Sequence, residues 1–256
     1  MMISAGIDIG SRTIALVVLD GSGTVRSELV DTGYTPLENA RELVAGLPPE
    51  TVITATGYGR HSARDGFAGR VVTEIKAHAH GAKKLFPGAG SVLDIGGQDT
   101  KVILLDGRGS VEDFQMNDKC SAGTGKFLEV MAGALGYQSV EEFGRDSLNG
   151  SPGIKISSMC TVFAESEAVS LLHRGGHRSD IGLALHLSVV ERALGLIQRI
   201  GFRTPMVFTG GVAFNPCIVE LLRKRIRGEL LIPQNPQLVG ALGAALAGLE
   251  VGSCRK

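Results

Sequence analysis

The sequence predicts an α/β protein made of two copies of one structural unit. Residues 5–23 and 91–109 align at a constant offset of 86, and seven of their 19 positions are identical. Each copy contains an apolar run that ends in Asp-Ile-Gly, a polar tip, a second apolar run and an Asp-Gly turn, which is the pattern of a β-hairpin. A duplicated hairpin at the start of each half indicates two related domains.

The rest of the chain alternates short strands with helices. Residues 51–59 and 205–215 are apolar runs that enter glycine turns, as expected for strands. Helical spacing of apolar residues occurs at residues 72–85, 126–135, 164–172, 181–200 and 239–249.

We therefore expect two lobes. The first covers residues 1–88 and is completed by a C-terminal helix at about residues 238–256, and the second covers residues 89–237. No Ser/Pro-rich linker separates them, so the boundary near Pro87–Gly90 is expected to be a short hinge.

Composition excludes several classes of function. The chain has 26 Lys and Arg and 26 Asp and Glu, so its formal charge is zero and no long-range field attracts nucleic acid or an anionic membrane. It has neither a long uncharged apolar run nor a signal-peptide pattern at its start, and its four cysteines are too few for a disulfide scaffold. We expect a cytoplasmic protein that binds neither nucleic acid nor a membrane.

The two hairpin tips predict a nucleotide site. An Asp at the end of a strand, followed by Gly, allows backbone N–H groups to face a phosphate while the carboxylate holds Mg²⁺ through water. A third strand ends in a Gly-Gly turn at Thr209–Val212. The three segments together are similar to the ATP site of the actin, hexokinase and Hsp70 superfold, in which two duplicated RNase H-like domains close over the nucleotide.

Two other nucleotide-binding motifs are absent. The segment Cys120–Phe127 lacks the first Gly and the final Ser or Thr of a P-loop, and GIDIGS has the wrong spacing for a dinucleotide fingerprint.

Two of the cysteines occupy similar positions. Cys120 and Cys160 each precede a helical segment, where unpaired N–H groups and the helix dipole favour a thiolate. Two thiolates are too few for an iron–sulfur cluster, which usually takes four, and no CxxC is present to hold zinc. A two-fold dimer would supply four thiolates, although two small buried side chains are the simpler alternative. We expect Cys217 and Cys254 to be structural.

These motifs resemble a known family. The segments GIDIGS, DIGGQDTK, NDKCSAGTGKFLE, SSMCTVFAESE and TGGV, spread over residues 5–248, are similar to the ATP-dependent activators of 2-hydroxyacyl-CoA dehydratases, a family that also contains the ATPase subunits of benzoyl-CoA reductase. The resemblance implies an oxygen-sensitive homodimer with one bridging [4Fe-4S] cluster, held by Cys120 and Cys160 of each subunit, and one ATP site per subunit.

The resemblance also implies the residues of the ATP site. The nucleotide-binding set consists of Asp8, Gly10, Ser11, Arg12 and Thr13 in the first loop, Asp94, Gly96, Gly97, Gln98, Asp99 and Lys101 in the second, and Gly123, Thr124, Gly125, Gly210, Gly211, Val212 and Asn215. Asp8 and Asp94 are expected to hold Mg²⁺ through water. Gln98 or Asp99 is expected to orient the attacking water, and Asp8 is counted with them as catalytic.

One position departs from the family pattern. Many members carry Lys five positions after the first-loop Gly, where this chain has Ala15. Arg12 is the residue that could supply positive charge at this hairpin. The histidines His78 and His80, which alternate in a polar stretch, are expected to be solvated.

The implied function is one-electron transfer driven by ATP. Ferredoxin or flavodoxin reduces the cluster, and ATP binding and hydrolysis then deliver the electron at low potential to an iron–sulfur enzyme. The acceptor can be a hydroxyacyl-CoA dehydratase, a benzoyl-CoA reductase or a double-cubane cluster protein. An alternative from another class is a small-molecule kinase of the same superfold, which would use the phosphate loops but leave the two cysteines without a role.

Overall fold

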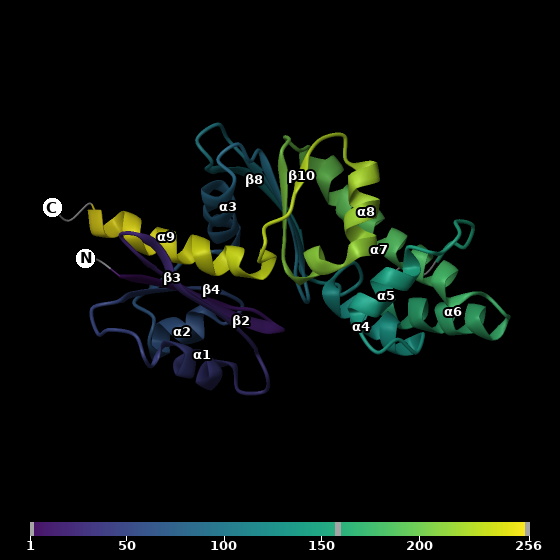
Figure 1. Ribbon diagram of the computed structural model, residues 1–256, viewed down its shortest axis with the longest axis horizontal. Coiled ribbons are helices and arrows are strands. Elements are labelled where there is room, and N and C mark those ends of the chain that lie inside the picture. Colours follow the sequence, from purple (N-terminus) through teal and green to yellow (C-terminus); the bar gives the residue numbers. More distant parts are fainter. Residues whose placement is uncertain (1–2, 157–159, 254–256) are drawn as a thin grey trace.

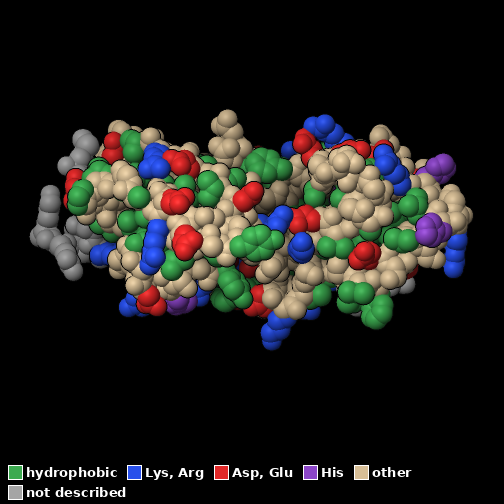
Figure 2. Space-filling view, turned by 90° about the horizontal axis from the view of Figure 1, so that it is seen from below, with side chains coloured by type: hydrophobic (Ala, Val, Ile, Leu, Met, Phe, Trp, Pro, Cys, Tyr) green, Lys and Arg blue, Asp and Glu red, His purple; other side chains and the backbone are tan. Residues whose placement is uncertain are grey.

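The computed structural model describes residues 3–156 and 160–253, with the side chains described as far as residue 250. These residues form two α/β lobes, each built on a five-stranded sheet (Figure 1). Charges of both signs are scattered over the face in Figure 2, as expected for a chain without net charge.

The first lobe is a mixed sheet with the strand order β3-β2-β1-β4-β5. In it, β1 runs antiparallel to β2 and parallel to β4. The apolar residues of β1 and β2 pack against Ala40 and Leu43 of the first helix and form the core of this lobe. The elements are β1 (Ser4–Ile9), β2 (Thr13–Asp20), β3 (Gly23–Asp31), α1 (Pro36–Val44), β4 (Val52–Gly57), α2 (Arg60–Gly66) and β5 (Arg70–Val71).

The second lobe repeats this sheet. Its order is β8-β7-β6-β9-β10, in which β6 is antiparallel to β7 and parallel to β9. The strands are β6 (Ser91–Ile95), β7 (Thr100–Leu105), β8 (Val111–Asn117), β9 (Met206–Thr209) and β10 (Leu230–Leu231). Since both lobes follow the same path from strand to strand, the predicted α/β class with two duplicated domains is confirmed.

The second lobe carries a larger set of helices. Helices α4, α5, α6 and α7 extend to the end of the molecule away from the first lobe, where α6 is outermost in Figure 1. Phe127, Phe143 and Leu185 join these helices to the sheet in one core cluster. The elements are α4 (Gly125–Ala134), α5 (Val140–Ser147), α6 (Thr161–His173), α7 (Arg178–Ile200), the 3₁₀ turn η1 (Gly211–Phe214) and α8 (Pro216–Arg225).

Two helices join the lobes. Helix α3 (Glu74–Leu85) packs Ala79 and Ala82 against the second sheet, and α9 (Val239–Ser253), which follows the turn η2 (Pro236–Leu238), packs Ala241 and Ala245 against β2 of the first sheet. The helices touch at Gly243, where a Cβ would overlap the carbonyl oxygen of Ala77. One turn earlier in α9, a Cβ at Gly240 would overlap Oδ2 of Asp8 and lie 3.1 Å from Nε2 of His78, so the start of α9 lies against the end of β1 and against α3.

The lobe boundaries at residues 88 and 238 stay a prediction, as does the helical end at residues 254–256, which lies outside the described residues together with Cys254. No helix in the described part of the chain is both long enough and apolar enough to cross a membrane.

Candidate functional site

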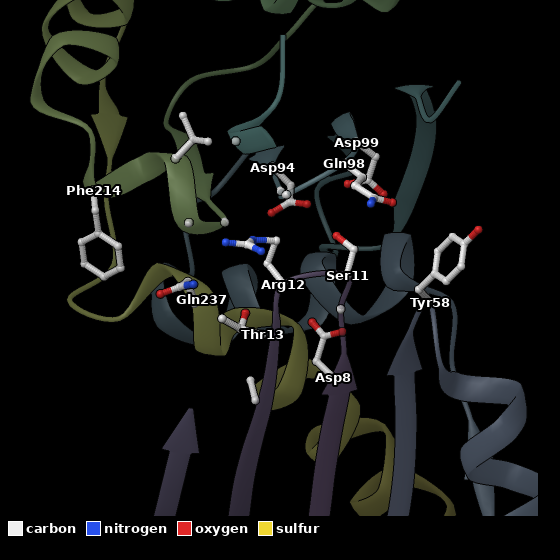
Figure 3. A pocket seen from close by; sticks show the side chains of 18 of the residues that line it. Asp8, Ser11, Arg12, Thr13, Tyr58, Asp94, Gln98, Asp99, Phe214 and Gln237 are labelled. Atoms are coloured by element: carbon white, nitrogen blue, oxygen red, sulfur yellow. The ribbon is translucent and has the colours of Figure 1, made fainter. Parts of the chain in front are cut away.

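A cavity of about 670 Å³ lies between the lobes. Figure 3 shows Phe214 and Gln237 on one side of it and Tyr58 on the other, with the two hairpin tips between them. The cavity is lined by nearly all of the predicted nucleotide-binding residues, namely Asp8, Gly10, Ser11, Arg12, Thr13, Asp94, Gly96, Gly97, Gln98, Asp99, Lys101, Gly125, Gly210, Gly211, Val212 and Asn215. Gly123 and Thr124 are not among the residues that line it.

The two predicted phosphate loops have the same backbone geometry. The N–H of Gly10 donates to the carbonyl oxygen of Thr13, and the N–H of Gly96 donates to that of Asp99, both at 3.0 Å. The loops also touch each other, because a Cβ at Gly97 would lie 2.5 Å from Cγ of Arg12 and 2.9 Å from Oγ of Ser11. Gly97 therefore allows the tips of the two lobes to meet.

The loop carboxylates Asp8 and Asp94 differ in protonation. Burial and the nearby carboxylate of Glu74 raise the pKa of Asp8 to about 7. Burial also acts on Asp94, but His78, Lys101 and a hydrogen bond from Thr209 outweigh it and hold the pKa of Asp94 below its ordinary value. Near neutral pH, Asp94 is ionised and Asp8 takes up a proton readily.

Lys101 neutralises much of this acidic site. Its Nζ lies 2.6 Å from Glu74 Oε2, 2.7 Å from Asp99 Oδ1 and 3.3 Å from Asp94 Oδ2. These carboxylates raise the pKa of the Lys101 ammonium despite its burial, so it stays charged. With three carboxylates around it, Lys101 positions the acids of the second loop and is a poor candidate for direct binding of phosphate.

His78 is a site residue that the sequence patterns did not reveal. It is 6% exposed and lines the cavity, so the expectation that it is solvated is wrong. Its Nδ1 lies 3.1 Å from Thr209 Oγ1, which in turn donates to Asp94 Oδ1. His78 follows Glu74 by four positions, which places both on one face of α3, and this spacing was the available signal. His80 is half-buried, and its Nδ1 is shielded from solvent without a hydrogen-bond partner among the described residues, so the same expectation is wrong for this nitrogen.

The third predicted segment follows β9. Gly210 has a φ of +85°, and a Cβ there would overlap the carbonyl oxygen of Ile95, so only glycine suits this turn. Asn215 reaches the cavity, but its side chain caps α8 by accepting from the N–H of Ile218 and lies 3.0 Å from His186 Nε2. Its amide is therefore occupied by structural bonds.

The remaining glycine segment follows Cys120. Thr124 is fully buried, and its hydroxyl donates to the carbonyl oxygen of Ser121. The carbonyl oxygen of Gly123 accepts from Thr100 Oγ1 at 2.9 Å. Gly123 and Thr124 thus attach this segment to the second hairpin, and Gly125 alone of the three faces the cavity.

The cysteines fall into two groups. Cys120 and Cys160 are exposed free thiols, and Cys160 occupies the N-cap position of α6. Ser121 Oγ and Thr161 Oγ1, from the residues that follow the two cysteines, lie 3.1 Å apart, so both thiols belong to one region of the surface. Cys217 is buried, and burial raises its thiol pKa to about 12, which supports a structural role. Among the described residues, no group of three or more His, Cys, Asp or Glu is placed to hold a metal ion.

Two duplicated lobes that enclose paired Asp-Ile-Gly loops define a nucleotide-binding protein of the actin and hexokinase type. A glucokinase from Streptomyces griseus, whose structure aligns with a TM-score of 0.56 at 15% identity over 97% of this chain and 99% of its own, shares this fold alone. The chain belongs to the BadF/BadG/BcrA/BcrD ATPase family, whose model matches residues 5–248.

Relatives within the family are much more similar. The activator of lactoyl-CoA dehydratase from Anaerotignum propionicum is 43% identical, over 97% of this chain and 98% of its own. The structure of the activator of 2-hydroxyisocaproyl-CoA dehydratase from Clostridium difficile, with bound ADPNP, aligns with a TM-score of 0.89 and 40% identity over 100% of this chain and 98% of its own. A benzoyl-CoA reductase component from Thauera aromatica is 32% identical over 97% of this chain and 93% of its own. The predicted family is therefore confirmed.

Proposed function

We propose that this protein is an ATP-driven one-electron transfer protein that activates an iron–sulfur acceptor enzyme of the 2-hydroxyacyl-CoA dehydratase type. The observation that carries the proposal is the pair of exposed thiols, Cys120 and Cys160, in one region of the surface of a chain that also has the nucleotide cavity. A kinase of the same fold would need the cavity but not the thiols.

The two cysteines fit half of a [4Fe-4S] site. Cys160 is the N-cap residue of α6, and Cys120 lies four positions before Thr124, the N-cap residue of α4. Both thiols are exposed, so a second chain can approach them. Val162 and Phe163 beside them are 65% and 66% exposed, which adds apolar surface for a contact between two copies. A cluster bound by four thiolates of a homodimer would supply a one-electron redox centre.

The segment that carries Cys120 is bonded to the second phosphate loop. The N–H groups of Gly125 and Lys126 donate to the carbonyl oxygens of Gly96 and Gly97, both at 2.9 Å. Asp118, two positions before Cys120, lines the cavity directly. A change at the phosphate loop can therefore alter the position of the thiols, provided that ATP binds the two arrangements with different affinity.

The nucleotide-binding roles follow from the cavity. Backbone N–H groups of the two loops bind the phosphates, Asp8 and Asp94 hold Mg²⁺ through water, and Gln98 orients the attacking water. Asp99, the other candidate for the water, is paired with Lys101 and is better suited to positioning. The reduced ferredoxin or flavodoxin, the homodimer and the cytoplasmic location belong to the same proposal.

The acceptor is proposed by similarity. Relatives named as dehydratase activators are more similar to this chain than the benzoyl-CoA reductase component, so a dehydratase is the first candidate. A benzoyl-CoA reductase or a double-cubane cluster protein is the alternative acceptor. Purified acceptor enzymes of the three kinds, tested for ATP-dependent reduction by this protein, distinguish between them.

The test is anaerobic purification followed by iron analysis, Mössbauer spectroscopy and measurement of mass in solution. We expect a brown dimer with about two irons per chain, as four iron atoms shared by two chains require. Cys120→Ala and Cys160→Ala should each abolish the cluster signal, whereas Cys217→Ala should retain it. A colourless monomer that consumes ATP in the presence of a sugar would contradict the proposal and favour a kinase.

A further inference from the structure

Among the described residues, Arg12 and Lys101 are the Lys and Arg side chains that line the cavity. They differ in how many carboxylates surround the positive charge and in how exposed it is. The ammonium of Lys101 is enclosed by three carboxylates and is 3% exposed. Arg12 is 55% exposed and lies at the tip of the first loop, against Gly97 of the second. A nucleotide phosphate that enters the cavity therefore meets Arg12 as the available positive charge.

Arg12 is paired with a carboxylate of the other lobe. Its Nε lies 2.9 Å from Oε1 of Glu129, which also lines the cavity. Arg12 belongs to the first lobe and Glu129 to α4 of the second, so this ion pair crosses the cleft. The Arg12 side chain is 55% exposed and that of Glu129 is 29% exposed, so solvent weakens the pair enough for it to exchange partners.

Glu129 belongs to the helix that follows Cys120. Helix α4 begins at Gly125, and its first N–H groups are bonded to the second phosphate loop. The preceding segment is attached to the start of α6 through Ser121 and Thr161, next to Cys160. A force on Glu129 therefore acts on the helix that connects the nucleotide cavity to both exposed thiols.

We propose that Arg12 is a nucleotide-dependent switch that binds Glu129 when no nucleotide is bound and exchanges it for the terminal phosphate of ATP. The terminal phosphate and the Glu129 carboxylate compete for the same guanidinium, so binding of ATP releases α4 from the first lobe. Arg12 can bind phosphate in a bidentate manner, which favours the exchange. This inference rests on the ATP-binding part of the proposed function and is independent of the iron–sulfur cluster.

The switch also explains how the chain operates with Ala15 in the first loop. Ala15 lines the cavity and packs against α9, and its methyl group brings no charge to the site. Arg12 lies closer to the tip of the loop, within reach of the other lobe. A cation at this position can have a partner on each side of the cleft.

Affinity measurements test the competition. The full-length protein and its Glu129→Gln variant are titrated with AMPPNP and with ADP, both with Mg²⁺, by calorimetry. We expect Glu129→Gln to tighten AMPPNP binding about three- to fivefold, as expected from removing an exposed ion pair, and to change ADP binding less than about twofold. In the Arg12→Ala background, the same substitution should have no effect.

Glu141→Gln is the matched control. Glu141 lines the same cavity, but its carboxylate is paired with Arg145 and not with Arg12. Loss of a negative charge in general would tighten AMPPNP binding equally in both variants, and this result would overturn the proposal. A Glu129→Gln effect that persists without Arg12, or that is equal for ADP and AMPPNP, would overturn it as well.

Hydrogen exchange tests the release of α4. AMPPNP should change the exchange of the amides of residues 125–134 in the wild-type protein, and Glu129→Gln should produce part of this change without nucleotide. In Arg12→Ala, AMPPNP should change these amides less than in the wild type, because only their bonds to the second phosphate loop remain to respond. A response equal to that of the wild type would overturn the switch. The calorimetry and the hydrogen-exchange measurements do not require iron. A protein that lacks a cluster would therefore refute the proposed electron transfer without contradicting this inference.

Discussion

The two phosphate loops share a backbone and differ in charge. Both carry an Asp at the end of a strand and the same Gly-to-carbonyl hydrogen bond three residues apart. In the first loop the variable positions hold Arg12, Thr13 and Ala15, and at the matching positions the second loop holds Gln98, Asp99 and Lys101. As a result, the pKa of Asp8 is raised to about 7 and that of Asp94 is lowered.

This difference indicates a division of roles within a duplicated unit. The second loop neutralises its own acids through the buried Lys101, so its charges are held in place. The first loop has no such lysine, and its Arg12 extends across the cleft to Glu129. The two loops share one backbone frame, and a few side chains pair the charges of the second within its own hairpin while Arg12 of the first pairs with the other lobe.

Removal of Lys101 is the strongest way to break this difference. Lys101→Met leaves Glu74, Asp94 and Asp99 without their shared cation, and we expect it to lower the free energy of unfolding by about 3–5 kcal/mol. Denaturant unfolding monitored by circular dichroism measures the loss. Lys126→Met, which removes the exposed pair with Glu129, is the control and should cost less than about 1 kcal/mol. Equal losses would mean that burial of Lys101 has no special effect.

Removal of the two loop carboxylates, one at a time, should change the free energy of unfolding in opposite directions. Asp94→Asn removes a charge that its neighbours stabilise, and we expect it to destabilise the protein at pH 7.5 by about 1–3 kcal/mol. Asp8→Asn removes a charge that burial and Glu74 disfavour, and we expect it to raise the free energy of unfolding by about 1 kcal/mol at that pH. A loss of stability in both variants, measured by urea unfolding, would contradict the difference between the loops.

The contributions of Asp8 and Asp94 to stability should depend on pH in opposite directions. Because the pKa of Asp8 lies above its ordinary value of 3.8, the folded chain binds more protons here than the unfolded chain, and the contribution of Asp8 to stability falls between about pH 4 and 7. Asp94 has a lowered pKa, so its contribution is present above about pH 4 and is lost as the solution becomes more acidic. Urea unfolding of Asp8→Asn from pH 4 to 7 should therefore lack one downward slope seen in the wild type.

The smallest expected effect concerns hydrolysis. Gln98 occupies the position of Arg12 in the second loop, is exposed to the cavity and makes no hydrogen bond with the described residues. If it orients the attacking water, Gln98→Ala should lower kcat for ATP hydrolysis by about tenfold with little change in nucleotide affinity. Steady-state hydrolysis and calorimetry separate the two quantities. An unchanged kcat would exclude Gln98 as the residue that orients the attacking water and would leave Asp99 as the candidate.

Much of the fold could be predicted because it depends on local patterns. The offset between residues 5–23 and 91–109 is visible without a structure, and the two sheets confirm the duplication that it predicts. Helices α4, α6 and α7 lie where their apolar spacing predicts them, within a few residues. The C-terminal helix was also expected, although the contact at Gly243 with α3 has no signal in the sequence.

Less of the site could be predicted, because it is assembled from distant segments. Glu74 and His78 come from α3, between the two repeats, and no hairpin motif includes them. Gly123 and Thr124 belong to a motif that suggested nucleotide contact, but their oxygen atoms are used to attach the segment to its neighbours. A motif identifies a region of the site, and it does not separate residues that face the ligand from residues that hold the loop.

The sequence by itself determined the repeated hairpins, the Asp-Ile-Gly tips and the cysteines before helices, because each is a pattern within a short run of consecutive residues. Only the tertiary structure decided which charges meet. Asp94 and Asp99 meet Lys101 within one hairpin, but its contact with Glu74 needs a distant segment. The burial of His78 and the ion pair of Arg12 with Glu129 likewise join segments far apart in the chain. Interactions of a few ångströms between residues far apart in the chain decide pKa values and ion pairs, and no local pattern contains those distances.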